Sequence, residues 1–296
     1  MMQVPDSYPR KDQLERIERY DFRGIHQNIR FGTASDRYAG WIGQIYPASY
    51  ATRTKKRTRK LAGVTYEERT VPIDSVVDYF QHFSVLEIDF TYYRPLVEED
   101  GSPSSNTHVL QRYVDAAPDN ARFILKVPNL FFSRRVMRRV EGKSKSVVND
   151  DYLNRDKYLV QFHRPAIELV GDRLKGLLFE QEYQRKAGAP TSDQNVEELD
   201  SFFEAVPREV PIHLEIRSPH LLDEPYFDWL ETCGLGHVFS HWTWLPPLRK
   251  QWRMSGERFT EADGEAMVRL LTPLKMPYAK AYAKTHPFDQ VVQSVA

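Results

Sequence analysis

The sequence has very little cysteine and no long apolar run, and both absences narrow the classes of protein that it can be. Its 296 residues include one cysteine, Cys233, so no disulfide can form within the chain, which fits a reducing compartment. No apolar stretch approaches the roughly 20 residues that span a bilayer, and the N-terminus has no signal-peptide pattern. We therefore expect a soluble cytoplasmic protein without a membrane partner.

The sequence also lacks net charge and the short motifs that would name a reaction. Forty-one basic and 41 acidic residues cancel, so any attraction to a polyanion has to be local. No HExxH, CxxC, GxSxG, P-loop or GxGxxG motif occurs. The function therefore has to be argued from where the charged residues lie along the predicted strands and helices.

Short β-rich runs alternate with helical patterns from residue 29 onward. The predicted strands are 29–34, 85–90, 122–127, 176–181, 212–217, 237–242 and 268–271, with a weak eighth at 289–293. The predicted helices are 11–19, 75–83, 108–116, 157–171, 196–206 and 224–234, the last with Gly234 as its stop signal. This alternation indicates an α/β fold with a parallel sheet and helical crossovers. About eight such units favour a (β/α)8, TIM-barrel-like fold over an open doubly wound sheet.

We expect a single domain at 29–296 behind an N-terminal extension at 1–28. After the weak strand no room remains for an eighth outer helix, so the barrel is incomplete at its C-terminus unless the extension covers the gap. Two basic insertions, 52–70 and 133–156, interrupt the strand–helix rhythm. In a barrel they lie on the C-terminal face, either as mobile, solvated loops or as a rim that attracts phosphate or nucleic acid.

Ionisable side chains recur near the ends of five consecutive predicted strands. Glu87 and Asp89 alternate with the apolar residues of the second strand and so point to one side of it. The later strands contribute Lys126, Glu180, His213, Glu215, Arg217 and His241. Most strands of a parallel sheet are covered on both faces, so buried charges there must pair, bind an ion or line a wet cavity. A structural salt-bridge network and a ligand-binding or catalytic site both stay open.

Three chemistries fit this set of side chains. A carboxylate pair among Glu87, Asp89 and Glu215 could supply a general acid and base, for a hydrolase, isomerase or lyase. Lys126 could act as a base or as a Schiff-base nucleophile. A divalent metal could be held by several candidate ligands: Glu87, Asp89, Glu180, Glu215, His213 and His241.

Aromatic residues gather at the same predicted face. They are Tyr38, Trp41, Tyr92, Tyr93, Trp242 and Trp244. Singly, each is more typical of packing, but together they predict a pocket that could stack a sugar, a base or another planar group.

In several blocks the sequence resembles the DUF72 family, the YecE-like proteins of unknown function. GTASDRYAGWIGQIYP (32–47) is similar to the family's GTSGWSYxGWxGxFYP, and YFQHFSVLEIDFTYYRPL (79–96) to YAxxFNTVEINSTFYRxP. FILKVP (123–128), KGLLFEQEY (175–183) and LEIRSPHL (214–221) are similar to FAVKAP, GPLLFQLPP and VEFRHPSW. The blocks follow in the same order over residues 29–245.

The resemblance implies a TIM-barrel-like fold with a site at its C-terminal face, and no established reaction. The family residue is kept at Glu87, Thr91, Tyr93, Arg94, Lys126, Glu215 and Arg217. Asp36, Asp89 and Glu180 depart from the family's Trp, Asn and Gln, and each adds a negative charge. Residues 241–259 lack the family's YVRLHG strand.

These observations together predict an enzyme for a small polar or anionic ligand, such as a phosphorylated sugar or a nucleotide fragment. Glu87, Asp89, Lys126 and Glu215 are the candidate catalytic residues. The candidate ligand-binding residues are Tyr38, Trp41, Thr91, Tyr93, Arg94, Glu180, Arg217, His241 and Trp242. The alternative is a nucleic-acid-associated or regulatory binding protein that uses the basic insertions, with a purely structural charged barrel end.

Overall fold

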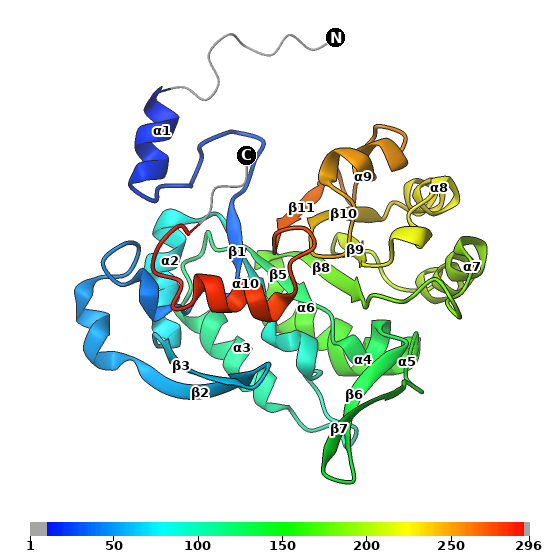
Figure 1. The fold of residues 1–296 in the computed structure, drawn as a ribbon, viewed down its shortest axis with the longest axis horizontal. Coiled ribbons are helices and arrows are strands. Elements are labelled where there is room, and N and C mark those ends of the chain that lie inside the picture. Colours follow the sequence, from blue (N-terminus) through cyan, green and yellow to red (C-terminus); the bar gives the residue numbers. More distant parts are fainter. Residues whose placement is uncertain (1–10, 293–296) are drawn as a thin grey trace.

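The computed structural model describes residues 11–292 and contains one curled sheet of seven parallel strands (Figure 1). In spatial order the strands are β1 (Gly32–Ala34), β4 (Val85–Ile88), β5 (Phe123–Lys126), β8 (Leu174–Gln181), β9 (Ile212–Ile216), β10 (Gly236–His241) and β11 (Met267–Leu270). Every neighbouring pair in this order is parallel. The spatial order follows the chain order, as it does in a (β/α) barrel.

The sheet is a half-barrel with helices on its outer side, so the predicted α/β fold with an incomplete barrel is confirmed. All seven strands predicted without reservation are present. The weak eighth strand is wrong, because residues 289–292 form neither strand nor helix. Residue 293 of that prediction, and residues 1–10 of the expected extension, lie outside the described residues. Within the described chain β1 and β11 end the sheet and do not pair with each other.

Most helices connect the strands and cover the outer side of the sheet, whereas α1 precedes the first strand and α10 follows the last (Figure 1). They are α1 (Lys11–Glu18), α2 (Val76–His82), α3 (Ser105–Ala116), α4 (Asn129–Phe132), α5 (Arg155–Tyr158), α6 (Arg164–Val170), α7 (Ser192–Phe203), α8 (Glu224–Cys233), α9 (Leu248–Met254) and α10 (Tyr278–Thr285). The six predicted helices are confirmed, and the one at 157–171 is completed by a π-helical stretch, Leu159–His163, between α5 and α6. No helix among residues 11–292 is long and apolar enough to cross a membrane.

Successive side chains along each strand point alternately to the outer side of the sheet, which is apolar, and to the inner side, which carries the charges. Outward residues such as Leu86, Leu125 and Phe179 are fully buried beneath the helices. The ring of Phe179 packs 5.1 Å from those of Phe132 and Phe203, within the range of favourable aromatic pairs. The residues that follow them, Glu87, Lys126 and Glu180, point inward, so the sequence periodicity is the reason that these charges meet inside.

Two close approaches inside the sheet require glycine. A Cβ on Gly32 of β1 would lie 2.0 Å from the carbonyl oxygen of Val85 on β4. A Cβ on Gly236 would lie 2.6 Å from Nδ1 of His213, whose ring also borders Gly176. His213 therefore fills a slot between two glycines on the neighbouring strands.

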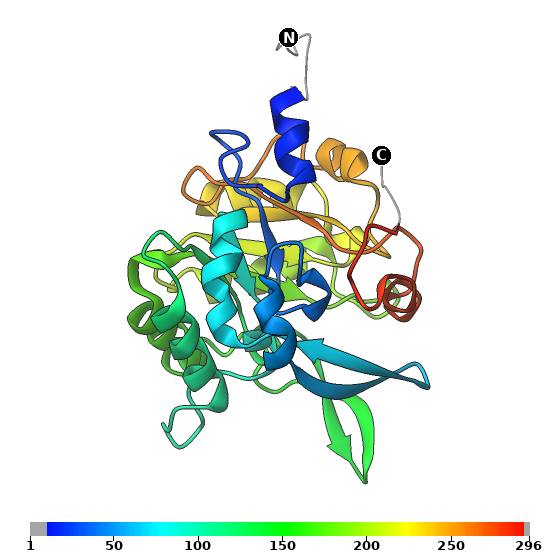
Figure 2. The same cartoon turned by 90° about the vertical axis from the view of Figure 1, so that its left-hand side faces the viewer.

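The two basic insertions form antiparallel hairpins and are not loops without regular structure. The first contains β2 (Lys55–Leu61) and β3 (Val64–Thr70), and the second β6 (Arg135–Val140) and β7 (Lys143–Val148). In Figure 2 the first hairpin (blue) points to the right and the second (green) points downwards from the lower part of the molecule. The β2–β3 hairpin packs against α10, where the Tyr66 and Tyr282 rings lie 4.9 Å apart. The β6–β7 hairpin extends freely.

Candidate functional site

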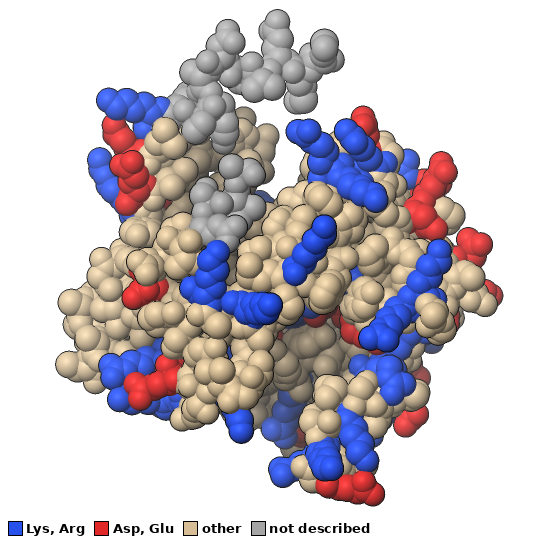
Figure 3. Space-filling view, in the orientation of Figure 1, with Lys and Arg blue, Asp and Glu red and all other residues tan. Residues whose placement is uncertain are grey.

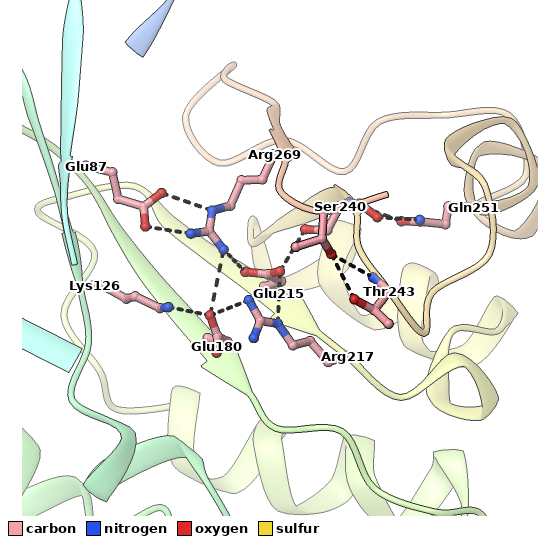
Figure 4. Close-up of polar contacts among 10 residues, drawn as sticks. Glu87, Lys126, Glu180, Glu215, Arg217, Ser240, Thr243, Gln251 and Arg269 are labelled. Atoms are coloured by element: carbon pink, nitrogen blue, oxygen red, sulfur yellow. Dashed lines mark hydrogen bonds and ion pairs between the residues drawn. The ribbon is translucent and has the colours of Figure 1, made fainter. Parts of the chain in front are cut away.

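Six charged side chains from five strands or strand ends meet inside the half-barrel (Figure 4). They are Glu87 of β4, Lys126 of β5, Glu180 of β8, Glu215 of β9, Arg217 just after β9, and Arg269 of β11. All six are largely buried, with 0% to 16% of each side chain exposed. Three carboxylates face three cations, so the cluster is neutral as a whole when every group is ionised.

Arg269 is the hub of this cluster. Its Nε and Nη2 donate to the two carboxylate oxygens of Glu87, at 2.9 and 2.7 Å. Its Nη1 donates to Glu215 and lies 3.7 Å from Oε2 of Glu180. The bidentate fork fixes the Glu87 carboxylate in orientation as well as in position.

Glu180 holds two other cations at a single oxygen. Its Oε2 forms ion pairs with Nζ of Lys126 and, at 2.7 Å, with Nη2 of Arg217. None of these contacts has the alignment of a hydrogen bond, so they are ion pairs by distance alone. The cations also rest on aromatic rings: Lys126 lies 4.2 Å from the centre of the Tyr92 ring, and Arg217 lies 4.7 Å from that of Trp242.

Glu215 is the most completely paired carboxylate of the cluster. Its Oε1 accepts from Nε of Arg217 at 3.2 Å and from the Ser240 hydroxyl at 2.9 Å, and its Oε2 accepts from Arg269. Burial alone would raise the pKa of Glu215. The positive charges of Arg217, Arg269 and Lys126, with the Ser240 hydrogen bond, lower it to about 2. Glu215 therefore stays ionised.

Glu87 and Asp89 show the opposite behaviour. Burial raises the pKa of Glu87 even though Arg269 and Lys126 oppose the shift. Burial also raises the pKa of Asp89, and the positive charges of Lys126 and Arg269 oppose that shift. Among residues 11–292, no basic side chain lies within ion-pair distance of the Asp89 carboxylate. Compared with Glu215, Glu87 and the neighbouring Asp89 therefore bind a proton more easily.

An open cavity of about 2850 Å³ adjoins the cluster. Glu87, Asp89, Lys126, Glu180 and Arg217 all line it. Its aromatic lining includes Tyr38, Trp41, Tyr92, Tyr93, Trp242 and Tyr278. Figure 3 shows the molecule hollowed between its C-terminal part and the projecting β6–β7 hairpin.

Tyr38 and Tyr93 stand at different depths of this cavity. Burial, followed by the negative charge of Asp89, raises the pKa of Tyr38 to about 12, so its hydroxyl remains a donor. The Tyr38 ring packs 4.8 Å from that of Trp41. Tyr93 is 75% exposed, which places it at the entrance.

Four further predicted site residues are not members of the cluster of six charged side chains. Thr91 is buried, and its hydroxyl lies 2.6 Å from the Lys126 carbonyl oxygen, so it supports the backbone that carries Lys126. Arg94 is exposed and pairs with Glu98 at 2.7 Å. His241 alternates with Ser240, whose hydroxyl points inward to Glu215, so the His241 side chain points away. His213 lines the cavity, but burial lowers its pKa to about 4 and its Nδ1 has no hydrogen-bond partner within the described chain.

The predicted metal ligands do not assemble into a metal site. Within residues 11–292, no group of three or more His, Cys, Asp or Glu side chains is placed to hold a metal ion. The physical reason is that Arg269, Arg217 and Lys126 occupy the carboxylate oxygens that a cation would need. The donor set fits internal ion pairing better than metal coordination.

The sequence interpretation missed Arg269, Ser240 and Gln251. Gln251 holds the Ser240 backbone by two hydrogen bonds, at 2.8 and 3.2 Å, and so fixes the hydroxyl that Glu215 accepts. A signal for Arg269 was present, because it is the one charged residue of MVRL, and VRL is the core of the YVRLHG block that residues 241–259 lack. Ser240 and Gln251 had no comparable signal.

A comparison with known protein families identifies one family. A sequence profile described as "Protein of unknown function DUF72" matches residues 30–296. No curated protein sequence matches the chain.

Two crystal structures of DUF72 family proteins are similar to this one. The protein from Thermotoga maritima MSB8 has 20% sequence identity and a TM-score of 0.49, and the match covers 82% of this chain and 74% of that one. The protein from Enterococcus faecalis V583 has 15% identity and a TM-score of 0.46, with 71% and 68% covered. The family match extends over most of the sequence, and the chain belongs to the DUF72 family of proteins of unknown function.

Proposed function

We propose that the charged end of the half-barrel is the active site of an enzyme that acts on a small anionic ligand by general acid–base chemistry. In this proposal Lys126 and Arg217 bind an oxyanion of the ligand, and Glu87 and Asp89 transfer protons. Glu215 is a fixed charge that positions Arg217 and Arg269. A reducing compartment such as the cytoplasm suits a chain with one cysteine.

One observation carries the anionic part of the proposal. Lys126 and Arg217 share one oxygen of Glu180 without aligned hydrogen bonds, and both line the cavity. Lys126 has three N–H donors and Arg217 five, so each keeps N–H groups beyond those that face Glu180. Two cations that meet at one oxygen are also close enough for a single carboxylate or phosphate group to contact both.

The acid–base part rests on the contrast in pKa among neighbouring carboxyl groups. Burial raises the pKa of Glu87 and Asp89, while the cations lower that of Glu215 to about 2. Groups whose environments push their pKa values apart suit different roles in proton transfer. The raised values suit a general acid or base, and the lowered value suits a permanent anion.

The rings beside the two cations define where the rest of the ligand lies. Tyr92 and Trp242 flank the proposed oxyanion position, and Tyr38 and Tyr93 continue the lining outward. Such faces suit a sugar or a planar ring linked to the anionic group. A phosphorylated sugar or nucleotide fragment has both parts.

The sharpest test uses Glu180, whose charge competes with the ligand for Lys126 and Arg217. In Glu180→Gln the two cations lose that competitor, so we expect inorganic phosphate and sugar phosphates to bind about tenfold more tightly, equivalent to about 1.4 kcal/mol. In Lys126→Met and Arg217→Gln we expect binding to weaken by a similar factor. Isothermal titration calorimetry on the full-length protein measures all three.

Circular dichroism checks that each variant is folded. Glu231→Gln on the exposed side of α8 is the matched control, since Glu231 pairs with Arg258 outside both the cluster and the cavity lining, so its replacement should leave binding unchanged. Equal phosphate affinity in the wild type and in folded Glu180→Gln, Lys126→Met and Arg217→Gln would show that no oxyanion binds here.

A further inference from the structure

The β6–β7 hairpin carries a positive charge that the fold leaves almost unneutralised. Between Arg135 and Val148 there are five basic residues and a single acid, Glu141. Only Lys145 has an ion pair, with Glu141 at 3.0 Å. Within the described chain no carboxylate lies within ion-pair distance of Arg138, Arg139 or Lys143, and all three are exposed.

The β2–β3 hairpin shows that this is not a general property of basic hairpins in this protein. It has six basic residues and two acids, yet Lys56, Arg57, Arg59 and Arg69 all form ion pairs with Glu67 or Glu68. Arg59 also stacks over the Tyr278 and Tyr282 rings of α10. The two hairpins have the same net charge, but four of the six cations are paired in the docked β2–β3 hairpin and only one of the five in the projecting β6–β7 hairpin.

The strand register of the free hairpin places like charges opposite each other. Arg138 pairs directly with Lys145 across the two strands. Like charges in that position destabilise a hairpin, so internal stability does not explain this arrangement. An external anion would relieve the repulsion.

The cations lie on both faces of the ribbon. Arg138, Lys143 and Lys145 share one face, and Arg135 and Arg139 alternate onto the other. A flat acidic surface, such as a membrane or the side of a protein, would meet only one face. A groove with a row of phosphates along each wall meets both faces at once, and the major groove of B-form DNA is wide enough for a two-stranded ribbon.

The composition of the hairpin separates duplex DNA from other nucleic acids. The sequence RVMRRVEGKSKSVV has no aromatic residue, and stacking on aromatic rings is what single-strand binders use. A-form RNA has a deep and narrow major groove that a ribbon does not enter. Basic residues interleaved with Ser144 and Ser146 suit contacts to phosphates.

The base of the ribbon is held firmly enough to present these charges. Nδ2 of Asn149 donates to the carbonyl oxygens of Leu130 and Ser133, and the backbone N–H of Arg135 donates to Glu182 at 3.0 Å. At the tip, Glu141 and Gly142 both have positive φ, the geometry of a tight two-residue turn. Basic side chains gather over this hairpin at the lower edge of the molecule (Figure 3).

We propose that the β6–β7 hairpin binds double-stranded DNA through its phosphates, with Arg138, Arg139 and Lys143 as the main contacts. The binding depends little on base sequence, because phosphate contacts carry no sequence information directly. It is independent of the proposed chemistry in the half-barrel.

Fluorescence anisotropy with the full-length protein and a labelled DNA duplex tests the proposal. With three phosphate contacts, affinity should fall about 40-fold between 50 and 200 mM salt, because the logarithmic slope is about −0.9 per contact. The double variant Arg138→Gln/Arg139→Gln should reduce that slope by about 2 and weaken binding by more than tenfold at low salt. The matched control, Lys55→Gln/Lys60→Gln, removes two unpaired charges from the other hairpin and should bind as the wild type does.

Three results would overturn the proposal. The first is the absence of duplex binding at 50 mM salt. The second is binding that Arg138→Gln/Arg139→Gln leaves unchanged. The third is equal or tighter binding to single-stranded DNA, to duplex RNA or to vesicles that contain phosphatidylserine. Single strands and vesicles have no groove between two rows of phosphates, and the major groove of duplex RNA is too narrow for the ribbon.

Discussion

Arg269 joins two carboxylates whose surroundings differ, and the two sides of this arginine behave as different regions of the site. On one side Glu215 is fully buried and accepts from two arginines and a serine hydroxyl. On the other side Glu87 has only Arg269 as an ion-pair partner in the described chain, and Asp89 beyond it has none. The Glu215 side is therefore closed to solvent and fully paired, whereas the side of Glu87 and Asp89 opens into the cavity.

The difference shows what decides whether a buried carboxyl group is a fixed charge or a proton carrier. Each group loses hydration, which raises its pKa, and only the number of surrounding cations and donors decides whether the shift is reversed. Three cations and a hydroxyl reverse it at Glu215. Arg269 and Lys126 do not reverse it at Glu87 or Asp89.

Replacement of Glu215 by Gln should have the largest effect on stability. The change keeps the shape of the side chain but leaves Arg217 and Arg269 buried with too few negative charges. We expect a loss of about 3–5 kcal/mol in the free energy of unfolding, the range for breaking a buried ion pair. Urea unfolding followed by tryptophan fluorescence measures it.

Glu67→Gln serves as the matched control for this prediction. Glu67 also meets two cations, Lys56 and Arg69, but its side chain is 57% exposed. We expect the control to cost less than about 1 kcal/mol. If the two variants lost equal stability, burial would not be what distinguishes the closed side.

The pH dependence of stability should separate the two sides by sign. The pKa of Glu215 is lowered from 4.5 to about 2, so its contribution is present above pH 4.5 and is lost as the pH falls towards 2. The wild type should therefore lose its advantage over Glu215→Gln within that window. An advantage that persisted unchanged at pH 2 would contradict the lowered pKa.

Asp89→Asn should have the smallest effect on stability and a sign opposite to that of Glu215→Gln. Burial raises the pKa of Asp89 above 3.8, so its ionised form opposes folding increasingly as the pH rises past that value. We expect the variant to be as stable as the wild type at low pH and more stable by up to about 1 kcal/mol at neutral pH. Thermal unfolding at pH 3.5 and pH 7.5 measures the difference, and a loss at pH 7.5 would mean that Asp89 has a stabilising partner.

The parts of the fold that follow from local periodicity could be predicted from the sequence. The strand at 85–88 alternates cleanly, and the helix at 224–233 ends at Gly234 in a left-handed conformation, as its stop signal indicated. The two hairpins could not be recognised, because a strand is recognised by apolar residues at every second position. Their exposed strands have no apolar face, and highly charged segments are usually interpreted as loops. Whether the sheet closes depends on which strands meet in space, which no local pattern encodes.

The sequence predicts those site residues whose inward orientation follows from the alternation of side chains along a strand. Glu87, Lys126, Glu180 and Glu215 were placed together because each alternates with outward apolar residues, and the structure brings all four to one cluster. His241 was misplaced because the inward phase of β10 is set by Ser240, a residue with no conspicuous chemistry. The pairing of Glu180 with Lys126 and Arg217 needed three-dimensional distances that the sequence does not contain.

The contact between Arg269 and Glu87 has a consequence for how this protein is made. The two residues are 182 positions apart, so the cluster is completed only when the last strand of the sheet reaches the second. Contacts of such long range form late, because a large loop must close before they stabilise anything. Before Arg269 has been synthesised, the Glu87 carboxylate in the growing chain lacks the guanidinium group that pairs with it. The site is therefore assembled only when the sheet is complete, so both are finished at the same stage of folding.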